Sequence, residues 1–340
     1  MAQMSTRKLG RTGVELTELS FGSAPLGNLF VEVGEEEAQQ TLGAAWDAGM
    51  RYFDTSPFYG YGKSEHRVGH FLRQRDLSSY VLSTKVGRVF KASTDPANFD
   101  QDMWLSGLPF EHVFDYSYDG IMRSYEDSTQ RLGLPRIDLL LIHDLDFWFH
   151  QNETRVMAYM NQLYTSGWRA LEELRSAGLI KGIGAGINEI GMMPRFLDMV
   201  DVDFFLVAMR YNMMEQPVLD GEFAQCAEAG VGIVVGAVFA SGILATGAIE
   251  GAYYNYEPAP PEIMEKARRM EAVCRSHGVE LAAAALKFPL GHPLVAAVIP
   301  GALNPVQVRA NAALFQGDIP ADLWAELKAE GLLRPDAPTP

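Results

Sequence analysis

The feature that most constrains the fold is a series of short apolar runs separated by longer amphipathic segments, from one end of the chain to the other. Most runs are continuously apolar, as expected for strands that are covered on both faces. The segments between them place apolar side chains at helical spacing. The eight runs are residues 19–22, 52–54, 80–85, 137–143, 182–186, 204–208, 233–236 and 296–300. Repeated strand–helix units predict parallel strands joined by right-handed crossovers.

Eight such units favour an α/β protein closed into a (β/α)8 TIM barrel. An open, doubly wound sheet obeys the same local rules and remains an alternative. Ahead of the first run, a glycine-containing turn at residues 10–13 separates residues 6–9 from residues 14–17, which predicts a β-hairpin. We expect this hairpin to cap the bottom of the barrel. Because no linker or low-complexity segment interrupts the pattern, we expect residues 1–340 to form one domain.

The composition narrows the classes of protein. A formal net charge of −15 argues against nucleic-acid binding, which needs Lys and Arg to neutralise phosphates. A hydrophobic content of 48% argues against disorder. The first residues contain no long apolar run, so we expect no secretory signal. Cys226 and Cys274 lie outside any CxxC motif, and we expect both to be reduced and buried in a cytoplasmic protein.

Residues 231–249 form an uncharged stretch of nineteen positions, which is about the length of a membrane span. However, four glycines interrupt it, and glutamates rather than Lys or Arg flank it. We therefore expect a buried strand that leads into a glycine-rich loop, and no membrane partner.

Polar residues stand where several apolar runs end. Asp54, Lys85 and His143 end the second, third and fourth runs, and Tyr59 follows Asp54 by five positions. Active sites of α/β barrels lie at the C-terminal ends of the strands, so these side chains are expected to converge. Individually, a buried Asp–Lys pair or a core histidine is more often structural. At successive strand ends they predict a catalytic set.

The four residues have a chemical logic. A tyrosine, with a pKa of about 10, is a poor base at neutral pH. We expect the ammonium of Lys85 to lower the pKa of Tyr59 toward the working range. Asp54 would keep a buried Lys85 charged. His143 would hold the substrate oxygen by a hydrogen bond, and Tyr59 would exchange the proton.

Two long, aromatic-rich segments, residues 87–117 and 144–154, follow the third and fourth runs. Loops of this length in compact domains are usually functional. We expect Trp148, in the second loop, to contact the substrate. The alternative is that these aromatic side chains only pack the loops down.

These motifs resemble those of the aldo-keto reductase family. The resemblance rests on residues 53–60 (FDTSPFYG), 83–85 (STK) and 141–144 (LIHD), and it extends over nearly the whole chain. It implies a nicotinamide-dependent oxidoreductase with Asp54, Tyr59, Lys85 and His143 as its catalytic tetrad. Within the family, residues 22–29 and 236–242 are similar to members that oxidise aldoses of the D-threo (L-fucose) type to lactones, or that oxidise pyridoxal. A general aldehyde or ketone reductase is a further alternative.

The resemblance also implies an extended NAD or NADP molecule across the barrel mouth. Asn188 would contact the carboxamide, and other residues would contact the rest of the cofactor. These are Gly22, Ser23, Ala24, Asp54, Phe239, Ser241, Gly242, Leu244, Pro300, Gly301, Gln307 and Asn311. The substrate, a sugar or another small aldehyde, would contact Tyr59, His143 and Trp148.

The chain departs from the common family pattern in two places. Many members stack a tyrosine on the nicotinamide at the position that Gly236 occupies here. NADP-preferring members place cations where this chain has Gly301 and Gln307, and Arg309 is the only charged residue between positions 299 and 311. Because Arg and Lys make the contacts that select a 2′-phosphate, we expect NAD to be preferred over NADP.

Three other classes of protein share some of these sequence features. Glu65, His66 and His70 could face one way on a helix, but a catalytic zinc usually takes three protein ligands, so we expect solvated surface histidines and no metal site. The Gly182-x-Gly184-x-Gly186 sequence lacks the later glycine of a dinucleotide-binding fingerprint. A regulatory barrel that binds the cofactor without turnover stays open.

Overall fold

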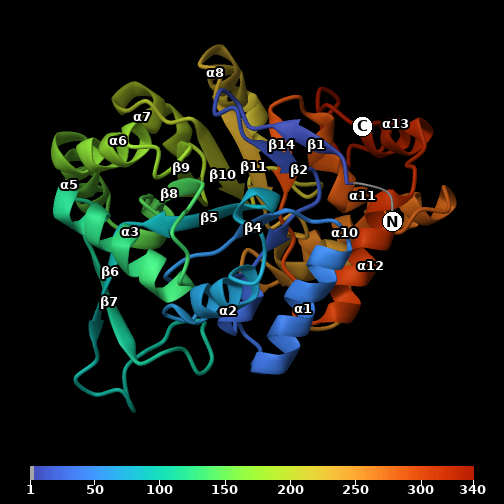
Figure 1. Ribbon diagram of the computed structural model, residues 1–340. Coiled ribbons are helices and arrows are strands. Elements are labelled where there is room, and N and C mark those ends of the chain that lie inside the picture. The colour runs from blue at the N-terminus through green and yellow to red at the C-terminus, as the bar shows by residue number, and fades with distance from the viewer. Residues whose placement is uncertain (1–3) are drawn as a thin grey trace.

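Eight parallel strands form the centre of the computed structural model, which describes residues 4–340 (Figure 1). In chain order they are β3 (Phe21–Gly22), β4 (Tyr52–Asp54), β5 (Val81–Val86), β8 (Leu139–His143), β9 (Gly182–Ile187), β10 (Phe204–Ala208), β11 (Gly232–Gly236) and β14 (Val295–Val298). Each strand pairs with the next in this order. All eight predicted strands are confirmed, with ends shifted by a few residues.

Contacts between the first and last strands close the sheet. Parallel bridges join Leu19 to Val298 and Gly22 to Gly301, and the backbone N–H of Ser20 donates to the carbonyl of Val298 at 2.9 Å. An open sheet would leave these two strands apart at opposite edges. The doubly wound alternative is therefore wrong, and the barrel is confirmed.

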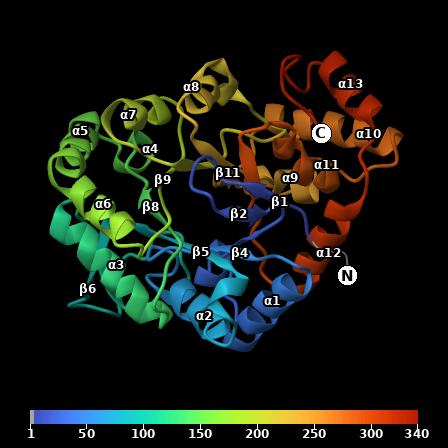
Figure 2. The same ribbon diagram turned by 45° about the horizontal axis from the view of Figure 1, so that its top comes forward.

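Helices surround the barrel and pack against the outward-facing side chains of the strands (Figures 1 and 2). They are α1 (Glu35–Asp47), α2 (Lys63–Leu72), α3 (Tyr118–Leu132), α4 (Phe147–His150), α5 (Glu153–Gln162), α6 (Trp168–Ser176), α7 (Met192–Met199), α8 (Glu222–Glu228), α9 (Ile243–Thr246), α10 (Pro261–Ser276), α11 (Leu281–Lys287), α12 (Pro305–Gln316) and α13 (Ala321–Ala329). A π-helical turn, Leu163–Gly167, joins α5 to α6. Short 3-10 turns cover Ala24–Gly27, Leu77–Ser79, Pro217–Asp220, Ala240–Gly242 and Phe288–Gly291.

The strands are apolar on both faces because the barrel has two cores. Inside the barrel, Tyr52, Leu139, Phe204 and Val234 pack together and are fully buried. Outside it, alternate strand residues belong to the larger core shared with the helices. This double burial explains the continuously apolar runs in the sequence.

The N-terminal hairpin fills the bottom of the barrel. Antiparallel β1 (Thr6–Lys8) and β2 (Glu15–Thr17) lie across the middle of the ring of helices in Figure 2. Leu9 and Leu16 extend the inner core and are fully buried. The predicted hairpin and its position are confirmed.

Two hairpins and one short helix lie in segments for which the sequence predicted no regular structure. Residues 87–117 were predicted as a long loop, but they contain the antiparallel pair β6 (Arg88–Ala92) and β7 (Phe110–Phe114). Part of the second long loop forms α4, whose first turn is capped by the Asp146 side chain. After α9, a small hairpin is formed by β12 (Tyr253–Tyr254) and β13 (Glu257–Pro258).

The uncharged stretch at residues 231–249 is β11 followed by a glycine-containing loop and α9, as expected. Among the residues that the structure describes, no helix is long and apolar enough to cross a membrane. Cys226 and Cys274 are both free and buried. Burial raises the pKa of Cys226 to about 12 and that of Cys274 to about 11.

The turn of the N-terminal hairpin provides a matched test of how tightly it is docked. Gly10 and Gly13 both have positive φ, but a Cβ atom on Gly10 would lie 2.5 Å from the backbone nitrogen of Gly232, whereas one on Gly13 would meet nothing within 4 Å. We predict that Gly13→Ala lowers the free energy of unfolding by about 1–2 kcal/mol, the cost of a left-handed L-residue. Gly10→Ala should cost at least about 2 kcal/mol more, because backbone must move. Urea unfolding of both variants measures the difference, and equal losses would contradict this docking.

Candidate active site

The predicted catalytic residues meet at the C-terminal mouth of the barrel. Asp54, Lys85 and His143 lie on β4, β5 and β8, which are neighbours in the sheet. Tyr59 lies in the loop between β4 and α2. Tyr59, Lys85 and His143 line one pocket, and Asp54 lies beside it with 1% of its surface exposed. The structure thus brings all four residues together.

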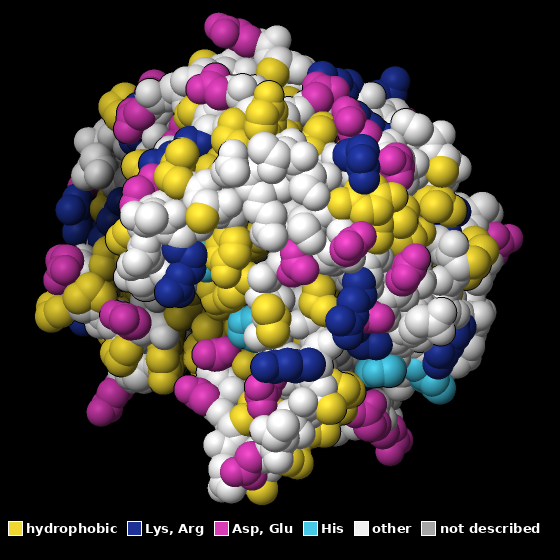
Figure 3. Space-filling model, turned by 90° about the vertical axis from the view of Figure 1, so that its left-hand side faces the viewer, with side chains coloured by type: hydrophobic (Ala, Val, Ile, Leu, Met, Phe, Trp, Pro, Cys, Tyr) yellow, Lys and Arg dark blue, Asp and Glu magenta, His cyan; other side chains and the backbone are white. Residues whose placement is uncertain are grey.

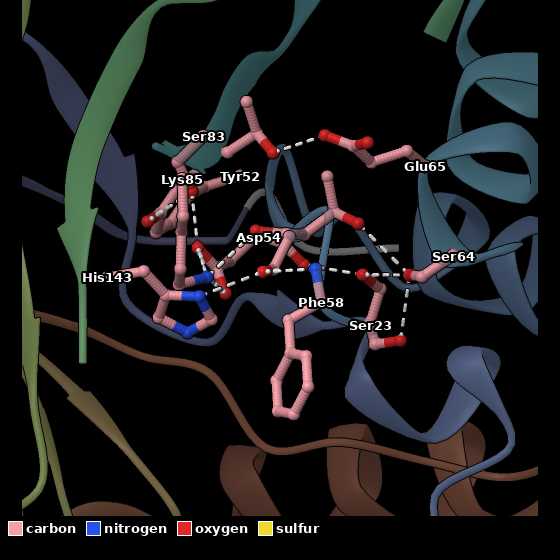
Figure 4. A network of polar contacts seen from close by, with 12 residues as sticks. Ser23, Tyr52, Asp54, Phe58, Ser64, Glu65, Ser83, Lys85 and His143 are labelled. Carbon is pink, nitrogen blue, oxygen red and sulfur yellow. Dashed lines mark hydrogen bonds and ion pairs between the residues drawn. The ribbon is translucent and has the colours of Figure 1, made fainter. Parts of the chain in front are cut away.

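A buried ion pair forms the base of the site (Figure 4). Lys85 Nζ lies 2.8 Å and 3.0 Å from the two carboxylate oxygens of Asp54, and it donates to the carbonyl of Thr55 at 2.8 Å. Ser83 donates to Asp54 Oδ1 at 2.6 Å. Both side chains of the pair are only 2% exposed. The buried Lys85 thereby has the acidic partner that the sequence predicted.

A relay of hydroxyl groups supports the loop that carries Tyr59. Ser64, on α2, lies within hydrogen-bond distance of Thr55 (3.0 Å) and Ser23 (2.7 Å), and Ser23 Oγ donates to the carbonyl of Asp54 at 2.7 Å. These contacts join the end of β3, the end of β4 and the first turn of α2 (Figure 4). The fully buried Ser23 hydroxyl is committed to this relay. The contact of Ser23 with a cofactor stays a prediction.

The hydrogen bonds around His143 indicate which nitrogen carries its proton. Ser56 Oγ accepts from the backbone N–H of Phe58 at 3.0 Å, so its own proton is available to His143 Nδ1, 3.1 Å away. Burial lowers the pKa of His143 well below its usual value, and the positive charges of Arg88 and Lys85 act in the same direction. A neutral imidazole that accepts at Nδ1 carries its proton at Nε2. We therefore assign the His143 proton to Nε2, the nitrogen that lies 3.3 Å from Asp144 Oδ2.

Tyr59 is not activated in the way that the sequence suggested. Burial, followed by the carboxylates of Asp54 and Asp144, raises the pKa of Tyr59 well above its usual value. Lys85 Nζ lies 4.8 Å from the centre of the Tyr59 ring, but it is bonded to Asp54 on both oxygens. The expected lowering of the Tyr59 pKa by Lys85 is wrong here, because burial and the two carboxylates act in the opposite direction and the ammonium is paired with Asp54. Tyr59 is held as a neutral phenol.

Aromatic side chains from separate loops form the walls of the pocket. Trp148 and Phe149 come from α4, and Trp104 comes from the segment between β6 and β7. The Trp104 ring lies 5.5 Å from that of Tyr59 and 5.4 Å from that of Phe58. The sequence predicted Trp148 as a pocket residue, and its position agrees. Trp104 was noted only as one aromatic among several in a loop.

The predicted carboxamide ligand, Asn188, lines the same pocket at the end of β9. Its Nδ2 donates to Asp144 at 2.8 Å and to Asp146 at 3.3 Å. The side-chain oxygen of Asn188 is then the atom suited to accept an N–H from a carboxamide. Ala24 also lines the pocket. The donor set therefore fits one end of a nicotinamide cofactor.

Gly236 leaves space that a neighbouring side chain partly fills. A Cβ atom on Gly236 would lie 3.2 Å from Leu206 Cδ2, so Leu206 occupies the position next to it. An aromatic ring reaches the pocket from elsewhere, because Tyr256 also lines it. Tyr256 has φ of 64°, and its backbone N–H donates to Ser241 Oγ at 3.0 Å. The sequence analysis missed Tyr256, although the cluster of three tyrosines at positions 253–256 was a possible signal.

The remaining predicted cofactor residues lie on the loops after β11 and β14. Ser241 and Gly242 form a left-handed turn with φ of 61° and 113°, while the Leu244 side chain is fully buried in the core. Gln307 Oε1 accepts from the backbone N–H of Leu303 at 2.8 Å, so it orders the start of α12. Phe239 packs against the core, and Asn311 is half-buried on α12. The backbone N–H of Gly22 donates to the carbonyl of Pro300 at 3.2 Å.

His66 and His70 are exposed on α2, as the sequence predicted. Within residues 4–340, no three His, Cys, Asp or Glu side chains are grouped closely enough to hold a metal ion. Glu65 faces the other way and is fully buried, where it accepts from Thr84 Oγ1 at 2.6 Å.

On one face of the molecule, acidic and basic side chains are interspersed around a hollow with hydrophobic lining (Figure 3).

A closed (β/α)8 barrel with a buried Asp–Lys pair beside a tyrosine and a histidine at its mouth has the architecture of a barrel oxidoreductase. Residues 18–330 match the model of the Aldo/keto reductase family. The chain belongs to this family, and the resemblance seen in its motifs is confirmed.

Two curated relatives are similar over nearly their full length. Pyridoxal 4-dehydrogenase from Microbacterium luteolum is 43% identical over 337 residues, which cover 96% of this chain and 97% of the relative. D-threo-aldose 1-dehydrogenase from a Pseudomonas species is 38% identical over 333 residues, with coverage of 96% and 97%. Among solved structures, an aldo-keto reductase from Bacillus halodurans in its holo form superposes with a TM-score of 0.74 at 24% identity, covering 98% and 97% of the two chains. That likeness supports the fold.

The raised pKa of Tyr59 gives a pH prediction. A phenol donates its proton in carbonyl reduction, and this form is fully populated below the raised pKa, so kcat/KM for reduction should stay flat from about pH 6 to 9. Alcohol oxidation needs the phenolate, whose population grows about tenfold per pH unit below the pKa, so oxidation should accelerate throughout this range. Rates measured in both directions across pH would test this. A plateau in oxidation near pH 7 would show that the pKa of Tyr59 is lowered in the working enzyme.

Proposed function

We propose that this protein is a nicotinamide-dependent dehydrogenase that oxidises the anomeric hydroxyl of an aldose to a lactone. The observation that carries the proposal is the pocket in which Tyr59 and His143 lie above the buried Asp54–Lys85 pair. The 38% identity to a relative named D-threo-aldose 1-dehydrogenase supports the choice of substrate class. We further propose a single-domain chain with a cytoplasmic location, where the two buried thiols would stay reduced.

Each residue has a role in this scheme. The substrate oxygen accepts a hydrogen bond from His143 Nε2, and the phenolate form of Tyr59 takes the hydroxyl proton while the C1–H bond breaks. A bound nicotinamide supplies the hydride acceptor. The C1–O bond then becomes the carbonyl of a lactone. The aromatic walls of Trp104 and Phe149 exclude water, which strengthens hydrogen bonds to the developing charge.

A second candidate is oxidation of pyridoxal, favoured by the 43% identity to a relative of that activity. Pyridoxal also closes into a hemiacetal, so the same groups would perform the same chemistry. Turnover of a panel of aldoses and pyridoxal, with NAD and with NADP, tests both candidates by the absorbance of the reduced cofactor. Turnover of simple aldehydes alone would favour a general reductase, and binding of the cofactor without any turnover would favour a regulatory barrel.

We predict that Tyr59→Phe lowers kcat by about 10²–10⁴-fold, because it removes the proton-carrying hydroxyl and little volume. Binding of the cofactor, measured by quenching of tryptophan fluorescence, should change less than about threefold, since the ring is retained. A variant that keeps more than about a tenth of the wild-type kcat would contradict the role of Tyr59.

We propose NAD as the preferred cofactor. Arg309 and Gln307 both lie exposed on the first turns of α12, and the Gln307 side chain is already bonded to Leu303. Gly301 cannot carry a cation without rearrangement, because a Cβ atom there would lie 2.6 Å from Pro25 Cγ. A 2′-phosphate would thus gain few charge-assisted contacts at these positions.

We predict that kcat/KM for NAD exceeds that for NADP by at least severalfold. Gln307→Arg should narrow the ratio by about tenfold, since a hydrogen bond to a charged group contributes roughly 1.5–3 kcal/mol. Gln307→Leu serves as the matched control, because it breaks the bond to Leu303 without adding charge. A wild-type preference for NADP would mean that Arg309 or another cation reaches the phosphate.

A further inference from the structure

A second buried ion pair lies at the mouth of the barrel, outside the four predicted catalytic residues. Arg88 is the first residue of β6, and Asp144 follows His143, the last residue of β8. Arg88 Nη2 lies 2.9 Å from Asp144 Oδ2, with side-chain exposures of 1% and 11%. Asp144 has φ of 46°, a strained conformation for a residue with a side chain. Strain of this kind is retained where the surroundings hold a residue in place.

Aromatic rings hold the guanidinium of Arg88. Its central carbon lies 4.3 Å from the centre of the Phe58 ring, 4.4 Å from that of Phe149 and 4.8 Å from that of Phe114. Within residues 4–340, Nε and Nη1 of Arg88 have no hydrogen-bond partner. Burying a guanidinium with unused donors is costly, and a buried ion pair by itself is weak evidence of stabilisation. The arrangement instead holds the Asp144 carboxylate in a defined position.

Asp144 still has capacity to accept a hydrogen bond. Its Oδ1 accepts from Asn188 Nδ2 at 2.8 Å, its Oδ2 accepts from Arg88, and His143 Nε2 lies 3.3 Å from Oδ2. A carboxylate offers about four lone-pair positions, so at least one is free. When His143 donates to a substrate oxygen instead, a further position becomes free. Asp144 lines the same pocket as Tyr59 and His143, so a molecule bound there can reach it.

We propose that Asp144 is a substrate-binding residue that accepts a hydrogen bond from a hydroxyl group near the reacting carbon, and that Arg88 is its positioning residue. The inference rests on the proposed function, because it concerns the substrate of that pocket. An ionised carboxylate only accepts hydrogen bonds, so it favours substrates that carry hydroxyl donors. A substrate without them would leave a desolvated carboxylate underused, which costs affinity. The pair therefore selects polyhydroxylated aldehydes and hemiacetals over plain aldehydes.

The test compares an aldose with an unhydroxylated aldehyde of similar reach. Asp144→Asn should lower kcat/KM for the aldose by about 10–100-fold, mainly through KM, as expected for the loss of one charged hydrogen bond. Because Asp144 also contacts His143 and Asn188, kcat/KM for reduction of a simple aldehyde such as butanal should fall too, but by a smaller factor than kcat/KM for the aldose. The ratio of the two values is the readout, because a general loss of structure or of His143 orientation would lower both together.

Variants of Arg88 separate positioning from direct contact. Arg88→Met should raise KM for the aldose, with little change in kcat, and Arg88→Lys should restore part of the loss because it keeps the charge. If either single variant fails to fold, the double variant Arg88→Met/Asp144→Asn removes the unpaired buried charge. It should show the same loss of preference for the aldose.

A partly buried ion pair at the other end of the barrel provides the control. Asp203 is 8% exposed at its side chain and pairs with Arg175 at 2.9 Å, just before β10 begins. Asp203→Asn should lower stability without changing the ratio of aldose to aldehyde activity.

The outcomes distinguish this inference from the proposed function. A wild-type enzyme that prefers the aldose, with an Asp144→Asn variant that loses the preference, supports both. A wild type that prefers the aldose while the variant keeps that preference, or loses both activities equally, overturns only the role of Asp144. If the wild-type enzyme has no higher kcat/KM for the aldose than for the plain aldehyde, both the proposed function and the role of Asp144 are overturned.

Discussion

The ion pair between Asp54 and Lys85 is the interaction on which the rest of the site depends. Two charges in a barrel core are tolerable only when they are paired and fully hydrogen-bonded, and here Ser83 and the carbonyl of Thr55 complete the set. Removing one partner of such a pair typically costs about 3–5 kcal/mol, because the other charge is left buried. The pair also places Lys85 Nζ 4.8 Å from the centre of the Tyr59 ring, at the pocket that Tyr59 and His143 line.

The electrostatic state of the mouth follows from this pairing. Lys85 is paired with Asp54, and Arg88 is paired with Asp144. Burial and the positive charges of Arg88 and Lys85 lower the pKa of His143, so its imidazole is neutral. Tyr59 is therefore a neutral phenol beside a neutral imidazole, both able to donate to one oxygen. Such a site stabilises negative charge that develops on a substrate oxygen, without presenting a net charge to the substrate beforehand.

The barrel and much of the site could be predicted because their signals are local. Each strand is covered on both faces, so it appears as a continuous apolar run, and the polar residue that ends it marks the mouth. The N-terminal hairpin could be predicted from the glycine-containing turn at residues 10–13 between two short strands. Predictions failed where they depended on distant neighbours. The pKa of Tyr59 is raised by its burial and by the carboxylates of Asp54 and Asp144, which tertiary contacts place beside it. Strands β6 and β7, within residues 87–117, pair through contacts that no short window of sequence reveals.

The sequence by itself determined that the chain is an eight-unit α/β protein and that Asp54, Lys85 and His143 stand at or near the ends of β4, β5 and β8. Periodicity and strand ends carry this information without reference to the rest of the chain. Only the tertiary structure decided that Arg88 holds Asp144 beside His143, that Tyr256 reaches the pocket from a hairpin twenty positions beyond Gly236, and that Pro25 blocks a side chain on Gly301. These are contacts between segments far apart in the chain, and closure of the barrel is what brings such segments together.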